Sequence, residues 1–123
     1  MRNDKAILIN ARTNTISFVS IKDYKDISKF GDFDIFTTVQ LDAKGNTLYV
    51  DDEGLINGTT IGFTIEGYEQ PLMGNGIILG TNLRTGDSKD TDFSLERVAS
   101  MVRCFVRAGR MLVRSGDNPK ISG

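Results

Sequence analysis

The chain has 123 residues, of which 39% are hydrophobic and 25% charged, a balance typical of a globular domain with a hydrophobic core. No apolar run approaches the roughly 20 residues of a membrane-spanning helix, and the start lacks the apolar segment of a signal peptide. The single cysteine, Cys104, excludes an internal disulfide. We therefore expect one cytoplasmic domain over residues 1–123, without a membrane partner.

The net charge of −1 hides an asymmetry along the chain. Residues 1–92 contain nine Lys or Arg against fourteen Asp or Glu, whereas residues 93–123 contain six basic and two acidic residues. A nucleic-acid-binding domain is usually basic throughout, so an acidic body argues against that function. A basic C-terminal element favours a local anion site instead.

The first half of the chain predicts strands and one short helix. KAILIN (Lys5–Asn10) and TISFVSI (Thr15–Ile21) flank a polar turn and predict a β-hairpin. In Asp23–Gly31, apolar residues recur every third position, which predicts one or two helical turns ended by Gly31. IFTTVQL (Ile35–Leu41) and TLYVD (Thr47–Asp51) then predict strands on either side of a turn.

Two further strands are expected at Gly62–Ile65 and Asn75–Thr81, followed by a polar loop. From Ser94, an N-cap candidate, apolar residues follow the three-four spacing of a helix, and Gly109 either interrupts or ends that helix. These apolar positions are Leu95, Val98, Ala99, Val102, Phe105 and Val106. The predicted fold class is α+β, an antiparallel β-sheet with a short helix and a long C-terminal helix packed on it.

The residue types argue against catalysis. The chain has no histidine, so it lacks the commonest general base and zinc ligand, and one cysteine cannot build a thiolate metal site. GNGIILG (Gly74–Gly80) lacks the P-loop lysine and the GxGxxG spacing, so we interpret it as a turn. The acidic run Asp51–Glu53 is interpreted as a solvated turn. We expect no enzyme activity, no metal and no cofactor.

Four arginines give the chain its most informative pattern. Arg103, Arg107, Arg110 and Arg114 follow at intervals of four, three and four, which places them on one helix face without acidic partners four residues before them. Arginine suits bidentate contact with phosphate or carboxylate. We weigh three explanations, namely an anion site, salt bridges within or between subunits, and a solvated face.

Three segments together resemble a family of small phage, prophage and plasmid domains of unknown function. They are KAILIN with TISFVSI, then TLYVDDEGLINGTTIGF, then NGIILGT, so the resemblance covers roughly Lys5 to Arg107. The expected C-terminal helix, with its arginines four apart, is further similar to the Thoeris anti-defence proteins of phages. Those proteins are non-enzymatic sponges that capture cyclic ADP-ribose-type signals at a dimer interface, and some also hold cyclic oligonucleotides.

The resemblance implies a set of ligand-binding residues. Arg103 and Arg107 would grip the phosphates of the ligand, and Arg110 continues the same series. The family also uses an aromatic ring and an asparagine, for which this sequence offers several candidates. The candidate rings are Phe63, Tyr68 and Phe93, and the candidate amides are Asn75 and Asn82.

Three functions follow as hypotheses. The first is a homodimer or higher homo-oligomer in the bacterial host cytosol that sequesters a nucleotide second messenger and so blocks antiviral signalling. The second is a phage- or plasmid-encoded inhibitor or adaptor that docks on an acidic host protein through the basic helix face. The third, weak nucleic-acid binding, is disfavoured by the acidic body.

Overall fold

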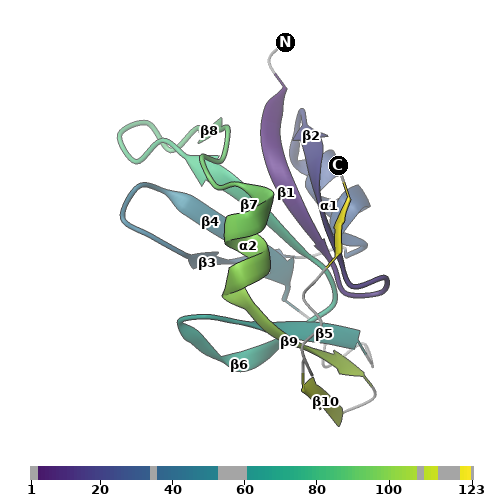
Figure 1. The fold of residues 1–123 in the computed structure, drawn as a ribbon. Helices are drawn as coiled ribbons and strands as arrows, with labels where there is room; N and C mark the ends of the chain where they lie inside the picture. The colour runs from purple at the N-terminus through teal and green to yellow at the C-terminus, as the bar shows by residue number, and fades with distance from the viewer. Residues whose placement is uncertain (1–2, 34–35, 53–60, 108–109, 114–119, 123) are drawn as a thin grey trace.

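The structure is a computed structural model that describes residues 3–33, 36–52, 61–107, 110–113 and 120–122. These residues form eleven strands and two short helices (Figure 1). The expected fold class is therefore wrong, because the described chain is mostly β and contains no long C-terminal helix. The strands divide into two sheets, one mixed and one antiparallel.

The larger sheet, sheet A, has seven strands in the order β11-β2-β1-β7-β4-β3, with β8 pairing the end of β7. All its pairings are antiparallel except that of β11 with β2. The predicted first hairpin is confirmed, with Asp4 opposite Ile21 and Asn10 opposite Thr15. The strands are β1 (Asp4–Asn10), β2 (Thr15–Ile21), β3 (Phe36–Gln40), β4 (Asn46–Asp51), β7 (Gly76–Thr81), β8 (Ser88–Lys89) and β11 (Lys120–Ser122).

The smaller sheet, sheet B, is antiparallel in the order β10-β9-β5-β6. Its strands are β5 (Ile61–Ile65), β6 (Tyr68–Met73), β9 (Val102–Arg107) and β10 (Arg110–Val113). Gly74, with a φ of 92°, turns the chain from β6 back into β7, so GNGIILG forms a turn and a strand as predicted. At Gly76 a Cβ would lie 2.7 Å from the ring of Phe63, so the two sheets approach closely at this glycine.

The predicted short helix is confirmed as α1 (Tyr24–Gly31). The Asp23 carboxylate accepts a hydrogen bond from the Lys25 N–H at 2.9 Å, which satisfies a free amide at the helix start. Asp32 ends the helix in the left-handed conformation, with a φ of 59°. The buried side chain of Ile27 fixes α1 to sheet A.

The predicted long helix is much shorter than expected. The N-cap is confirmed at Ser94, whose hydroxyl accepts from the Arg97 N–H at 3.0 Å, but α2 (Leu95–Met101) ends where Val102 becomes extended. The next residues, VRCFVR, are rich in β-branched and aromatic types and pair with β5 as strand β9. Pairing with a distant strand therefore overrides a helical periodicity that is real only over α2.

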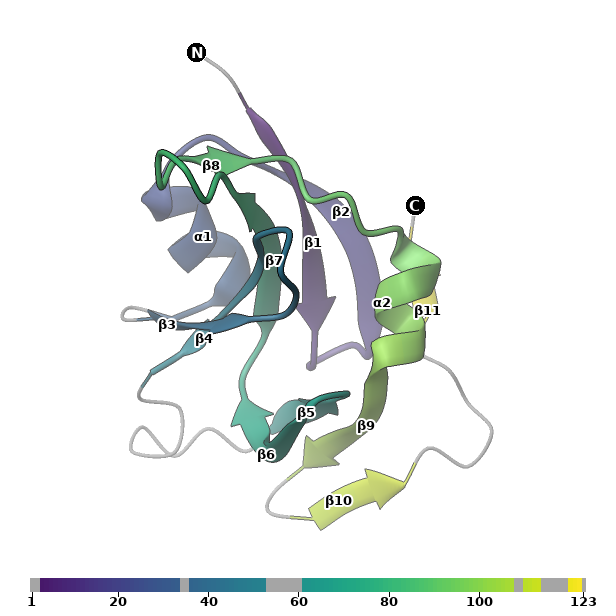
Figure 2. The ribbon, with the colours of Figure 1, turned by 90° about the vertical axis from the view of Figure 1, so that its left-hand side faces the viewer.

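Two apolar clusters fill the space on either side of sheet A. One lies between sheet A and α1 and includes Ala6, Tyr49 and Ile77. The other lies between sheet A, α2 and sheet B, and includes Ile7, Phe63 and Phe105. The two helices consequently lie on opposite sides of sheet A (Figure 2). Every residue of β7 from Gly76 to Gly80 is buried, because this central strand has a cluster on each face.

Candidate functional site

The arginines expected to clamp a ligand lie on strands of sheet B. Arg103 is exposed on β9, between Cys104 and Val102, and has no partner of its own in the register with β5. This irregularity has the form of a β-bulge, which turns a side chain away from its neighbours. Arg107 and Arg110 are opposite one another in the β9–β10 register, and their side chains lie outside the description. Gly109 and Arg114 also lie outside the described residues.

The two candidate amides serve as structural acceptors in different places. Asn75 is buried before β7, where its Oδ1 accepts from the Ala11 N–H at 2.9 Å. Asn82 follows β7, and its Oδ1 accepts from the Arg84 N–H at 2.9 Å. Asn82 therefore organises the turn before β8, whereas Asn75 ties the first hairpin to β7.

The three candidate rings also separate. Phe63 is fully buried in the shared core, so it cannot reach a ligand without unfolding that core. Tyr68 begins β6 at the edge of sheet B and is partly exposed. Phe93 is half-buried immediately before α2, and it alone of the three lines a cleft described here.

The cleft at Phe93 has a volume of about 380 Å³, within the roughly 300–1,000 Å³ typical of small-molecule sites. It forms where the turn between β3 and β4 meets the segment that leads into α2. We call it the Phe93 cleft, and its lining residues are Asp42, Lys44, Asp92, Phe93, Ser94 and Arg97.

One buried side chain, Asn46, holds the two halves of the Phe93 cleft together. Its Nδ2 donates to Asp42 Oδ2 at 2.8 Å and to Asp92 Oδ1 at 2.7 Å, and its Oδ1 accepts from the Thr91 hydroxyl at 2.7 Å. Thr91 Oγ1 in turn accepts from the Phe93 N–H at 3.2 Å. The position of the Phe93 ring therefore depends on a residue 47 positions earlier in the chain.

The charge on Asp42 is stabilised at this turn. Partial burial raises the pKa of its carboxyl, but hydrogen bonds from the Asn46 side chain and from the backbone of Asn46, Lys44 and Gly45 outweigh burial. The pKa consequently lies below its ordinary value, and Asp42 is ionised at neutral pH.

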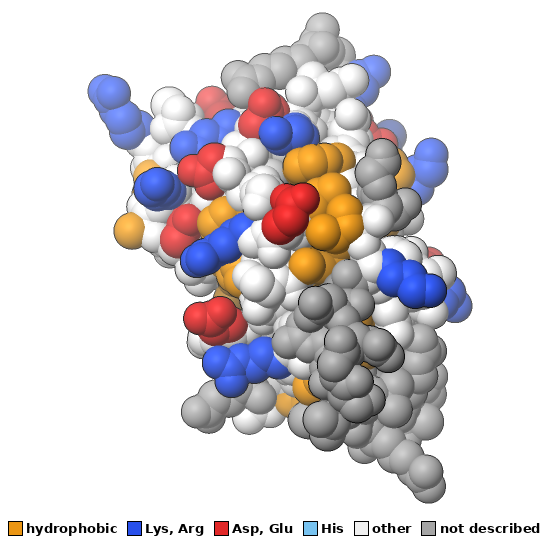
Figure 3. All heavy atoms as spheres, in the orientation of Figure 1, with side chains coloured by type: hydrophobic (Ala, Val, Ile, Leu, Met, Phe, Trp, Pro, Cys, Tyr) orange, Lys and Arg blue, Asp and Glu red, His pale blue; other side chains and the backbone are white. Residues whose placement is uncertain are grey.

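Two basic residues balance the two carboxylates of the Phe93 cleft. The Arg97 guanidinium lies 5.9 Å from the centroid of the Phe93 ring, within cation–π range, and Lys44 lines the cleft from the turn. On the face of the molecule drawn in Figure 3, acidic and basic side chains are interspersed. The formal charges of the lining residues cancel, so an anion would meet local cations without a strong surrounding field.

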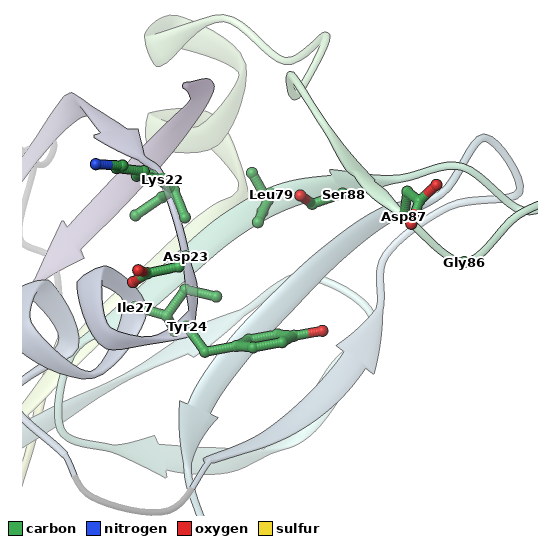
Figure 4. A pocket seen from close by; sticks show the side chains of 9 residues that line it. Lys22, Asp23, Tyr24, Ile27, Leu79, Gly86, Asp87 and Ser88 are labelled. Carbon is green, nitrogen blue, oxygen red and sulfur yellow. The ribbon is translucent and has the colours of Figure 1, made fainter. Parts of the chain in front are cut away.

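A second cleft, of about 280 Å³, lies on the other side of sheet A at the start of α1. We call it the Tyr24 cleft; Tyr24 and Ile27 line it from the helix, and Leu79, Asp87 and Ser88 line it from the strands (Figure 4). Lys22 extends away from Tyr24 and Asp87, so its amine does not enter the space between them (Figure 4). This cleft offers apolar walls and two carboxylates, those of Asp23 and Asp87.

Of the three candidate rings, Phe93 lines this cleft, and the sequence did not indicate the residues that lie beside it. Asp42, Lys44 and Asn46 belong to the DAKGN turn, whose glycine and Asx residues indicated only a turn, and nothing in the sequence places that turn beside Phe93. Within the described residues there is no group of three potential metal-binding side chains, and no helix is long and apolar enough to cross a membrane.

The chain matches no family model, no curated protein and no solved structure.

Proposed function

We propose that this chain binds a phosphate-containing nucleotide in the Phe93 cleft and holds it without turnover. The observation that carries the proposal is the Arg97 guanidinium over the Phe93 ring, in a cleft that Lys44 also lines. The ring and the guanidinium plane are stacking surfaces for a base, and guanidinium and ammonium groups are good donors to phosphate.

The carboxylates give the cleft its preference for a nucleotide over inorganic phosphate. Asp42 and Asp92, bridged by the Asn46 amide, can accept hydrogen bonds from a base amino group or a ribose hydroxyl. Since the lining charges cancel, affinity should come from stacking together with one or two phosphate contacts. The resemblance to phage anti-defence proteins favours a cyclic ADP-ribose-type or cyclic oligonucleotide signal as the natural ligand.

The helix face that was expected to carry either a nucleotide clamp or a protein partner is replaced by strand β9. The alternative of a protein–protein inhibitor stays a prediction, but no described helix presents Arg103 and Arg107 side by side.

Calorimetric titration with ADP, and with adenosine as the ligand lacking phosphate, tests the proposal. We expect Arg97→Ala to weaken ADP binding about tenfold or more and to change adenosine binding less, because charge-assisted bonds to phosphate are lost. Arg84→Ala, which removes an exposed arginine from the turn after β7, is the matched control. Equal ADP affinity in the wild type and Arg97→Ala, or recovery of cleaved nucleotide after incubation, would contradict the proposal.

A further inference from the structure

The four edges of the two sheets differ in how they discourage the addition of another strand. On sheet B, β6 contains Pro71 and pairs irregularly with β5, and β10 begins with Arg110. On sheet A, β11 has three residues and begins with Lys120. Proline, irregular pairing, basic residues and shortness are the usual means of protecting a sheet edge.

Strand β3 has none of these protections. Its sequence, FTTVQ, contains no charge and no proline, and its five residues pair with β4 in an uninterrupted register. It lies at the outer edge of sheet A, where no described strand pairs with its other side (Figure 1). Thr37 and Thr38 are exposed. Among the strands that the structure describes, β3 is therefore a regular edge on which another strand could pair.

The hydrogen bonds between β3 and β4 show which backbone groups face outward. The Leu41 N–H donates to the Asn46 carbonyl at 2.8 Å, so this pair is hydrogen-bonded. In an antiparallel ladder every second pair is hydrogen-bonded, so Val39 and Thr37 also bond to β4. Thr38 lies between them, and its N–H and C=O consequently point away from β4.

We propose that two copies of this chain associate by pairing their β3 strands antiparallel across a two-fold axis. The outward-facing residues are Phe36, Thr38 and Gln40, so the axis would pass beside Thr38, which would meet the same residue of the second copy. Phe36 of each copy would then lie opposite Gln40 of the other. The two copies of sheet A would form one continuous sheet.

A second copy fits this edge because a two-fold axis brings like residues together. Such pairing is unfavourable for a charged strand, but every side chain of β3 is uncharged. On one face the central pair would be two threonines, and on the other Thr37 would meet Val39. Pairs of β-branched residues and of threonines are favourable across antiparallel strands.

Sedimentation equilibrium of the full chain over a range of concentrations tests this pairing. We expect a reversible dimer in the wild type and a dissociation constant on the order of a hundredfold higher in Thr38→Pro, because both bonds of the central pair need the Thr38 N–H. The proline removes an N–H that β4 does not use, so β3 should remain paired with β4. Thr38→Val, which keeps the N–H and the shape, is the matched control and should still form the dimer.

Thr38→Lys provides a second test that does not depend on how proline fits the strand. It changes an exposed side chain and places two positive charges opposite each other, so it should also raise the dissociation constant. A wild-type monomer at every concentration, or unchanged association in folded Thr38→Pro and Thr38→Lys, would overturn the proposal. Both results are independent of ADP binding, which concerns a different part of the surface.

Discussion

The two clefts on either side of sheet A have a similar arrangement of elements but different charged groups. In each, an aromatic side chain lies beside the capped start of a helix, with Phe93 next to Ser94 and Tyr24 next to Asp23. Phe93 is half-buried with Arg97 over its ring, whereas Tyr24 is 70% exposed and stacks on Phe36 with ring centroids 6.1 Å apart.

The difference is one of charge, and it is the reason for placing the proposed nucleotide site at Phe93 and not at Tyr24. At the Tyr24 cleft, the helix cap is a carboxylate, Asp87 adds another, and Lys22 points away, so a phosphate would meet repulsion. At the Phe93 cleft, the cap is the neutral Ser94 and two basic side chains are present. On these charges, we expect a phosphate-containing ligand to be accepted at the Phe93 cleft and disfavoured at the Tyr24 cleft.

The largest effect should come from removing the side chain that builds one cleft and not the other. We expect Asn46→Leu to lower the free energy of unfolding by about 3 kcal/mol, because the buried amide is only 3% exposed and its partners would lose their hydrogen bonds. ADP binding should be lost as well, since the β3–β4 turn and Phe93 would no longer be held together. Urea denaturation and calorimetric titration measure the two effects.

Asn82→Leu is the matched control for that substitution. Asn82 also accepts backbone hydrogen bonds, but it does so in an exposed turn beyond the end of β7. Asn82→Leu should therefore lower the free energy of unfolding by about 1 kcal/mol and leave ADP binding intact. Equal destabilisation by the two variants would show that Asn46 has no special role in joining the turn to the segment before α2.

Elements that depend on neighbouring residues could be predicted from the sequence, and elements that depend on distant pairing could not. The β1–β2 hairpin, α1 and the Ser94 cap were predicted because each depends on residues close together in the chain. The prediction of a long C-terminal helix was wrong because β9 forms by pairing with β5, about forty residues earlier. No local sequence pattern indicates a pairing partner that far away.

The residues of the Phe93 cleft also differ in whether the sequence indicated them. Phe93 was one of three candidate rings that the family resemblance called for, and the sequence did not single it out. Lys44 and Asp42 could not be predicted, because the contact between their turn and the segment before α2 depends on Asn46, a residue whose sequence context indicates only a turn. A single buried amide that joins distant segments has no periodicity by which it could be recognised.

The next effect concerns affinity. We expect Phe93→Leu to weaken ADP binding about tenfold, because the stacking surface and the cation–π contact with Arg97 are lost while an apolar side chain remains. Tyr24→Leu, the same change at the other cleft, should leave ADP affinity unchanged. Titration of both variants with ADP measures the difference. A larger loss of ADP affinity in Tyr24→Leu than in Phe93→Leu would place the nucleotide site at the Tyr24 cleft instead.

The helix caps should contribute a smaller and similar amount at each cleft. Ser94→Ala and Asp23→Ala each remove a hydrogen bond to a backbone amide, so each should lower the free energy of unfolding by about 1 kcal/mol. Thermal denaturation checks this expectation. Restoration of stability by Ser94→Asp and Asp23→Ser would attribute the loss to the cap itself, whereas no loss in the alanine variants would contradict that role.

The smallest effect is a pH dependence that belongs to the Phe93 cleft. The pKa of Asp42 is lower in the folded chain than its ordinary value, so the folded state binds fewer protons at this carboxyl than the unfolded state. The stability that the ionised carboxylate contributes is therefore fully present above about pH 4 and is lost as the pH falls through the lowered pKa.

Asp42→Asn separates this contribution from those of the other carboxyls. The variant keeps the size of the side chain but cannot titrate, so its stability should lie below that of the wild type at neutral pH and approach it as the pH falls to about 3. Urea denaturation of both proteins across that range measures the narrowing difference. A difference that stays constant with pH would mean that the hydrogen bonds from Asn46 and the turn backbone do not favour the charged form of Asp42.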